Sequence, residues 1–418
     1  MKTKVLLLSL ITVTNLMALN MDEAVEKALT VSHSLKSQEY KISTSKANEA
    51  LLDAAFKPNV STTYNYGKRN FENFINTKEE SLFNVSVDYN LFNGFYDKYN
   101  LQSQKHLTNS EQWVLQSNIA DLKQLTRKRY LSLLQALQSK TVQDEAVALL
   151  EKQLQDSQSR LNQGMIAKSK YLKVKVELQG SQQAQLQANS NIINAKNALS
   201  SLMQETINPH DLEEPQSNPI AETSFDNLYS MSLEKRSELK YLEALKKSQV
   251  SSMTAVDSVY YPKVGLALDY NKYGDELIPN GVSYGALGTV ENEVIASVQI
   301  SYELYGGGKS DNQKMIHKTQ VLSLNEEIEK TKLDIKLQLQ EALEQLKVSE
   351  GQIEVARGSI VEAQEHYRIT KNRYREQLDT TTQLLDARLL LTTAQSNFTL
   401  AEYSYQDMVV NIKRVLGE

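Results

Sequence analysis

The chain has 418 residues, a formal net charge of −5 and no cysteine. The lack of cysteine excludes both a disulfide framework and an amino-terminal lipid-bearing cysteine. The acidic balance argues against nucleic-acid binding, and a hydrophobic content of 40% argues against one thick globular core.

The first 18 residues resemble a secretory signal peptide. Lys2 and Lys4 precede the apolar run "VLLLSLITV", and Ala18 provides a small residue at a cleavage site. We expect residues 1–18 to be removed, so that the mature chain begins near Leu19. Loss of the two lysines would take the net charge from −5 to −7.

Long helical stretches should occupy most of the chain, because the prolines are confined to a few places. They lie at two expected strand starts, in one loop and in one linker (Pro58, Pro262, Pro279, Pro209, Pro215 and Pro219). We predict helices at 20–56, 97–162, 168–204, 222–258, 309–376 and 381–416. The longest would measure on the order of 100 Å at about 1.5 Å per residue.

Four segments alternate between apolar and polar residues. The segments 83–91 and 294–304 do so most regularly, and shorter ones follow Pro58 and Pro262. Alternation is typical of membrane strands with lipid on one face and water on the other, although a half-buried sheet of a soluble protein gives the same pattern. The mature chain has no stretch of about 18 apolar residues, so any crossing would need strands in a closed barrel. Four strands are too few for a barrel, whereas three chains would supply twelve.

Two loops should join the paired strands, at roughly 68–81 and 274–292. The second is rich in glycine and contains Pro279. We expect both to be flexible loops on the outer surface.

The sequence is internally duplicated. Pro58 and Pro262 are 204 positions apart, whereas "LFNG" at 91–94 and "LYGG" at 304–307 are 213 apart. The offset changes because the second loop is longer. We therefore predict a first repeat at 19–208, a linker at 209–221 and a second repeat at 222–418.

Heptad spacing marks the last two helices. Apolar residues recur every seven positions, with small residues in the companion positions (Leu339, Leu346, Ile353, Ile360, Tyr367 and Tyr374; Ala342, Ser349, Ala356, Ala363 and Thr370). Leu391, Phe398, Tyr405 and Ile412 repeat in the same way. The pattern predicts knobs-into-holes packing, in a helical wall or in an ordinary coiled-coil dimer.

Taken together, the chain resembles the TolC-like outer-membrane efflux protein family over its mature length. The resemblance rests on the proline-started strands, on the "LFNG" and "LYGG" junctions, and on the helix turns "RLNQGMIAKSKYL" and "RYREQLDTTTQLL". It implies an α+β membrane protein, internally duplicated, whose trimer forms a 12-stranded outer-membrane β-barrel continued by a long α-helical coiled-coil barrel in the periplasm.

The function implied is that of a passive exit duct in the outer membrane, serving a tripartite efflux system or a type I secretion system. The partners implied are two further copies, a periplasmic membrane-fusion adaptor, an inner-membrane pump and outer-membrane lipid. No cofactor is implied. Drugs, metals and polypeptides all remain open as exported substrates.

The resemblance also assigns roles to the two helix turns. They would form the periplasmic tip and contact the adaptor (Gly164, Met165, Ile166, Ser169, Gln377 and Leu378); plain helix reversal without a partner is the alternative. Gly164 can supply the positive φ that a tight reversal needs, whereas Gln377 stands where the family usually has glycine.

Acidic residues narrow the channel entrance in the family, and their positions here hold Gln383 and Asp386. A ring of three Asp386 carboxylates would favour cations, although a solvated surface aspartate is the alternative. Tyr374 matches a residue that latches the closed tip. The two charged latch positions hold Lys170 and Asp379, with both signs reversed relative to the family, so we predict a charge-swapped latch.

Catalytic and metal-binding motifs are not evident. The five histidines lack metal-ligand spacing, and "GGGK" at 306–309 lacks the full spacing of a phosphate loop. We therefore predict that the protein is not an enzyme. A periplasmic coiled-coil adaptor or structural protein, and a passive porin with more strands and shorter helices, are the alternatives.

Overall fold

A computed structural model describes residues 19–70, 78–215, 224–283 and 288–418. The predicted signal peptide, and parts of the predicted linker and of both predicted loops, lie outside the described residues. The helices are α1 (Met21–Val31), α2 (His33–Asp53), α3 (Tyr96–Asn162), α4 (Lys168–Met203), α5 (Phe225–Lys235), α6 (Ser237–Val256), α7 (Lys309–Arg375) and α8 (Thr381–Val415). None of the described helices is both long enough and apolar enough to span a membrane.

The chain divides into two compact units. The helical unit comprises Met1–Lys36, Ser117–Arg236 and Leu333–Glu418, and the sheet unit comprises Ser37–Gln116 and Ser237–Lys332. The long helices α3 and α7 each contribute residues to both units.

Two helices that we predicted to be continuous are broken. The predicted helix 20–56 is interrupted at Ser32 (φ −61°, ψ 114°), and the predicted helix 222–258 is interrupted at Arg236 (φ −62°, ψ 120°). These residues are 204 positions apart, so both repeats contain the same break. Ser32 accepts a hydrogen bond from the Leu35 backbone N–H (3.3 Å), and so caps the start of α2. Neither break contains proline or glycine, which is why the sequence did not reveal them.

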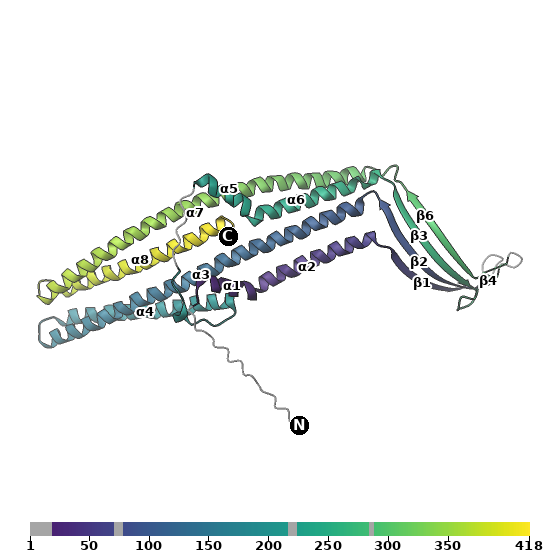
Figure 1. Cartoon of the computed structure of the whole chain (residues 1–418). Coiled ribbons are helices and arrows are strands. Elements are labelled where there is room, and N and C mark those ends of the chain that lie inside the picture. Colours follow the sequence, from purple (N-terminus) through teal and green to yellow (C-terminus); the bar gives the residue numbers. More distant parts are fainter. Residues whose placement is uncertain (1–18, 71–77, 216–223, 284–287) are drawn as a thin grey trace, which may run out of the picture. The chain divides into compact units, whose positions relative to one another are not determined.

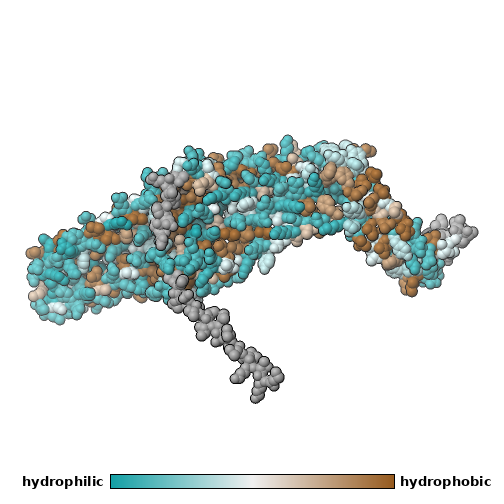
Figure 2. Space-filling view, in the orientation of Figure 1, coloured by the Kyte–Doolittle hydropathy of each residue, from teal (hydrophilic) through white to brown (hydrophobic). Residues whose placement is uncertain are grey.

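The strands β1 (Asn59–Lys68), β2 (Glu79–Asn93), β3 (Lys263–Gly274) and β6 (Asn292–Ser301) form one antiparallel sheet in the order β1-β2-β3-β6 (Figure 1). Its register confirms the predicted alternation. Val85 lies opposite Thr62 and Tyr270, and Tyr270 lies opposite Val294, so the apolar residues share one face. Figure 2 shows hydrophobic side chains gathered over the strands of the sheet unit.

On the other face the side chains bond to one another across the strands. The Asn84 amide donates to Asn271 Oδ1 (2.8 Å), and the Ser61 and Ser86 hydroxyls are 2.8 Å apart. This face is therefore polar and internally hydrogen-bonded.

The last strand is shorter than predicted. Tyr302 and Leu304 were expected within it, but β6 ends at Ser301. The equivalent end of β2 continues to Asn93, because Phe92 and Asn93 pair with Val264 and Lys263 of β3. The end of β6 has no such neighbour on its outer side among the described strands, and Leu304 and Tyr305 are about nine-tenths exposed, at 90% and 87%.

The second predicted loop contains structure of its own. The segments β4 (Val282–Ser283) and β5 (Thr289–Val290) pair as a small antiparallel ribbon. The loop predicted at 274–292 therefore includes one short paired segment, which the sequence did not indicate.

The helical unit builds the same core twice. In the first repeat, Ala24 of α1 packs with Tyr130 of α3 and with Leu199 and Met203 of α4. In the second repeat, residues at matching positions pack together: Leu228 of α5, Leu343 of α7, and Ile412 and Leu416 of α8. The duplication seen in the sequence is thus a duplication of packing.

The heptad prediction for α7 and α8 is confirmed. The small companion residues (Ala342, Ser349, Ala356, Ala363 and Thr370) are all buried. Ala363, Leu391 and Ala394 form one cluster, with Ile360 and Tyr367 packed against it. The two helices run side by side, as do α3 and α4 within the helical unit (Figure 1).

Candidate functional site

The two helix turns have the same backbone hydrogen bonds. In the first, the Gly164 N–H donates to Leu161 O (2.9 Å) and the Met165 N–H donates to Arg160 O (2.8 Å). In the second, the Gln377 N–H donates to Tyr374 O (3.1 Å) and the Leu378 N–H donates to Arg373 O (2.9 Å). This pair of bonds is the Schellman motif that ends many helices, with a left-handed residue after the last turn.

The left-handed residues are Gly164 (φ 72°) and Gln377 (φ 64°). An ideal Cβ at Gly164 would meet no atom within 4 Å, so the glycine serves backbone conformation and not close packing. Gln377 adopts the same conformation despite its side chain, and the predicted departure from glycine changes the strain of the turn but not its shape.

The predicted adaptor-contact residues lie at the tips of these turns. Met165 is 57% exposed and Leu378 is 67% exposed. Ile166 is half-buried, and Ser169 is exposed. Each turn thus presents one large apolar side chain to solvent, from the residue that follows its left-handed position.

The two turns differ in how the next helix begins. Ala167 precedes α4 without a side-chain cap, whereas Thr380 precedes α8 in a capping box with Gln383. Gln383 Oε1 accepts from the Thr380 N–H (2.8 Å), and Thr380 Oγ1 accepts from the Gln383 N–H (3.3 Å). The side chain of Gln383, one of the two predicted entrance residues, is therefore engaged in its own helix terminus.

Tyr374, a predicted latch residue, joins the two turns within one chain. Its side chain is 5% exposed, and the Arg160 guanidinium lies over its ring at 4.7 Å from the centroid. Arg160 is in turn paired with Asp156 (3.0 Å). Among the described residues, the buried Tyr374 hydroxyl has no hydrogen-bond partner. A cation–π contact of this kind contributes about 0.5–2 kcal/mol.

The other two latch residues are not brought together within this chain. Asp379 pairs with Arg373 (3.0 Å), and no ion pair joins it to Lys170 within the described ranges. Lys170 is exposed. The predicted charge-swapped latch between Lys170 and Asp379 therefore stays a prediction.

Asp386 lies on the exposed face of α8. The preceding residue, Leu385, is buried in a cluster with Val147, Leu150 and Val174. The carboxylate therefore points away from this core, as a pore-lining residue or a solvated surface residue would.

A buried arginine next to these residues was missed by sequence reasoning. Arg388 is 7% exposed and donates from Nη1 to Ala146 O (2.9 Å), while its buried Nε has no hydrogen-bond partner among the described residues. Burial lowers the pKa of its guanidinium, an effect that Glu177 partly offsets. Its position, four residues after Leu384 and three before Leu391, places it on the apolar stripe of α8, and this spacing was the available signal.

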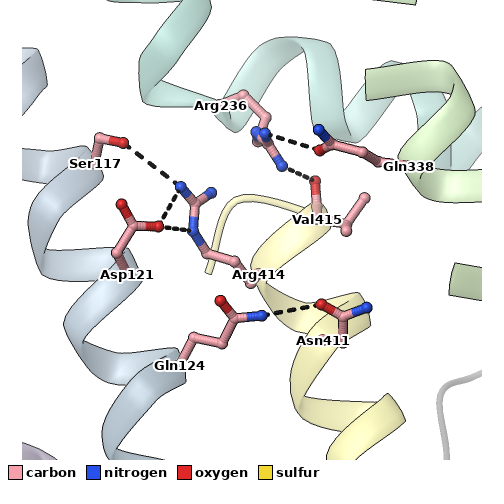
Figure 3. Close-up of polar contacts among 8 residues, drawn as sticks. All are labelled: Ser117, Asp121, Gln124, Arg236, Gln338, Asn411, Arg414 and Val415. Atoms are coloured by element: carbon pink, nitrogen blue, oxygen red, sulfur yellow. Dashed lines mark hydrogen bonds and ion pairs between the residues drawn. The ribbon is translucent and has the colours of Figure 1, made fainter. Parts of the chain in front are cut away.

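A second polar group, also missed, joins the two repeats through α3 and α8 (Figure 3). The Arg414 guanidinium contacts Asp121 (2.7 Å), and the Gln124 amide donates to Asn411 (3.0 Å). Buried Arg236, the residue at the helix break, donates to Val415 O (3.4 Å) and Gln338 Oε1 (3.2 Å). The C-terminal end of α8 is thus held by polar contacts, whose partners could be found only from the tertiary fold.

No cluster of three or more histidine, cysteine, aspartate or glutamate residues suited to a metal ion occurs in the described ranges.

The model of the outer membrane efflux protein family matches residues 24–204 and 228–418. The chain belongs to this family. Comparison with curated protein sequences finds no match.

Solved structures show the same fold at low sequence identity. A membrane protein from Pseudomonas aeruginosa superposes with a TM-score of 0.82 at 16% identity, covering 95% of this chain and 93% of that one. The Campylobacter jejuni outer membrane channel CmeC gives 0.78 at 14% identity, covering 95% and 85%. The open state of the Neisseria gonorrhoeae outer membrane channel MtrE gives 0.77 at 14% identity, covering 95% and 88%.

Membership confirms the resemblance, the duplicated α+β fold and the outer-membrane location. As an outer membrane efflux protein, the chain acts as an exit duct and not as an enzyme. The adaptor and porin alternatives are thereby set aside.

Proposed function

We propose that three copies of this outer membrane efflux protein join their sheets into one closed, twelve-stranded channel wall. The observation that supports this is the state of the sheet edges. In the described sheet, β1 and β6 each pair on one side only. Unpaired edges are a liability that closure removes, and four strands per chain are too few to close alone.

The internal duplication supplies a register for the missing pairing. Within the chain, Ser86 of β2 lies opposite Asp269 of β3. Adding 213 to Ser86 gives Gln299 of β6, and subtracting 204 from Asp269 gives Asn65 of β1. Gln299 should therefore lie opposite Asn65 of a second copy. Both residues are on the polar face, so the register keeps the apolar face continuous.

Cysteine pairs test this arrangement, because the natural chain has no cysteine to interfere. Gln299→Cys combined with Asn65→Cys should form disulfide-linked trimers in outer membranes on mild oxidation. In the control, Gln299→Cys is combined with Tyr66→Cys, which places one thiol on each face and should link poorly. Equal linking in both variants, or none in either, would contradict the proposed register.

The helix turns serve as the periplasmic end of this duct, where an adaptor connects it to an inner-membrane pump. The exposed Met165 and Leu378 at equivalent tips support this role, because repeated apolar side chains suit a docking surface. We expect Met165→Asp with Leu378→Asp to reduce co-purification of the adaptor at least tenfold while the trimer persists. Exposed Lys175→Asp on α4 is the control. If the same amount of adaptor co-purified with the double variant, the turns would only reverse the chain direction and would not contact the adaptor.

A further inference from the structure

The segment 275–280, which follows β3, lies against the apolar face of the sheet. Gly274 shares its face with Tyr270 and Leu268, because residues two apart in a strand point the same way. An ideal Cβ on Gly274 would lie 2.5 Å from Pro279 Cα and 2.8 Å from Asn280 N. Since a Cβ there would point out of the apolar face, Pro279 and Asn280 must cross that face directly above Gly274.

The same segment reaches across the sheet to β1. The Tyr64 hydroxyl donates a hydrogen bond to the carbonyl oxygen of Leu277. Tyr64 belongs to the apolar face, and β2 lies between its strand and β3. Ser81, which lies opposite Gly274 on β2, is only 3% exposed, as expected for a residue beneath a covering segment.

Two aliphatic side chains project from the segment. Leu277 is 60% exposed and Ile278 is 75% exposed. The segment that carries them lies on the side of the sheet that also exposes Tyr64 and Phe83. An apolar tip that is fixed onto the lipid-facing side of a membrane sheet, and not over its polar face, is placed to meet acyl chains.

We propose that the 275–280 segment anchors the channel in its membrane by inserting Leu277 and Ile278 among the acyl chains of the outer leaflet. This inference rests on the proposed function, because it requires the apolar face of the sheet to contact lipid. Gly274 permits the close approach, and Tyr64 holds the far side of the segment.

Tryptophan fluorescence can test the insertion, because Trp113 is the single tryptophan of the chain. In a Trp113→Phe background, reporters are placed at Ile278→Trp, at Glu276→Trp and at Val298→Trp on the apolar face. The full-length protein is reconstituted in phosphatidylcholine vesicles with bromine on the acyl chains. We expect the lipid to quench the reporter at 278 at least twofold more than the reporter at 276, and to quench the reporter at 298 strongly.

A second variant links the quenching to the observed contact. Gly274→Ala should lift the segment and reduce the quenching of the reporter at 278 at least twofold. Gly265→Ala is the matched control, because a Cβ there would meet no atom within 4 Å. Unchanged quenching in Gly274→Ala would mean that the contact does not hold the segment in lipid, and would overturn the proposal.

The outcomes separate this inference from the proposed function. If the reporter at 298 is quenched by brominated lipid but the reporter at 278 is reached only by aqueous acrylamide, the anchor is wrong and the channel stands. If neither reporter is quenched by lipid, the apolar face does not contact the membrane, and both proposals fall.

Discussion

At the scale of single residues, left-handed backbone conformations occur directly before and directly after the long helix of each repeat, α3 and α7. Gly164 and Gln377 end the long helices, and Gly94 and Gly307 precede them, each pair 213 positions apart. Phe95 also has a positive φ of 67°, which glycine provides at its partner position, Gly308. Both repeats therefore keep the same backbone conformation at the ends of their long helices, even at the two positions where only one repeat has glycine, the residue that favours a positive φ.

Replacing Gln377 by glycine should stabilise the second turn. A left-handed L-residue costs about 1–2 kcal/mol, part of which is offset by the greater flexibility of glycine in the unfolded chain, so we expect a net gain of about 0.5–1 kcal/mol. Hydrogen exchange of the 373–380 region would report slower local opening. Gly164→Ala is the converse variant and should loosen the first turn by about 1 kcal/mol. Faster exchange in Gln377→Gly would show that its side chain stabilises the turn.

At the scale of elements, helices of the sheet unit meet through small polar side chains. The Ser103 hydroxyl of α3 lies 2.8 Å from the Ser248 hydroxyl of α6. The Thr108 hydroxyl of α3 lies 2.9 Å from the Ser45 hydroxyl of α2. One turn after Ser103, His106 is half-buried. Burial lowers the pKa of the His106 imidazole, and Lys247 of α6 lowers it further.

This histidine should make the contact between α3 and α6 sensitive to acid. A lowered pKa means that, as the pH falls below about 6.5, the unfolded chain binds a proton before the folded one does. The free energy of unfolding therefore decreases as the pH falls from about 6.5 toward the pKa that His106 has in the folded chain. In His106→Gln, the drop in thermal midpoint between pH 7.5 and pH 5 should shrink. Exposed His210→Gln is the control, and an unchanged drop in His106→Gln would assign the acid sensitivity elsewhere.

At the scale of the whole molecule, function depends on what the copies present to one another. The Asp386 side chain is exposed, whereas the preceding Leu385 is buried. We predict that the exposed face of α8 lines the channel, where threefold assembly would place three Asp386 carboxylates around one axis. Such a ring attracts cations and repels itself.

The predicted ring can be measured in reconstituted channels. Asp386→Asn keeps the shape of the side chain and removes its charge, so we expect the preference for cations over anions to fall at least twofold. Asp226→Asn, at an exposed position on α5, is the control for a general loss of charge. Selectivity that is unchanged in Asp386→Asn would identify Asp386 as a solvated surface residue.

The sequence by itself determined the features that arise from local periodicity and from repetition. Alternation revealed the two faces of the sheet, heptads revealed the packing of α7 on α8, and the offsets of 204 and 213 revealed the duplication. These patterns follow from strand and helix geometry alone, and can be read without knowing which elements become neighbours.

Only the tertiary structure decided which side chains meet. It placed Arg388 against the Ala146 carbonyl, set Arg236 at a helix break beside Val415, and ended β6 at Ser301, where its outer side lacks a neighbouring strand. It also laid Leu277 across the sheet beside Tyr64. Each of these features depends on residues that are far apart in the chain. Such a contact leaves no local pattern in the sequence, because the two residues stabilise each other only after folding has brought them together.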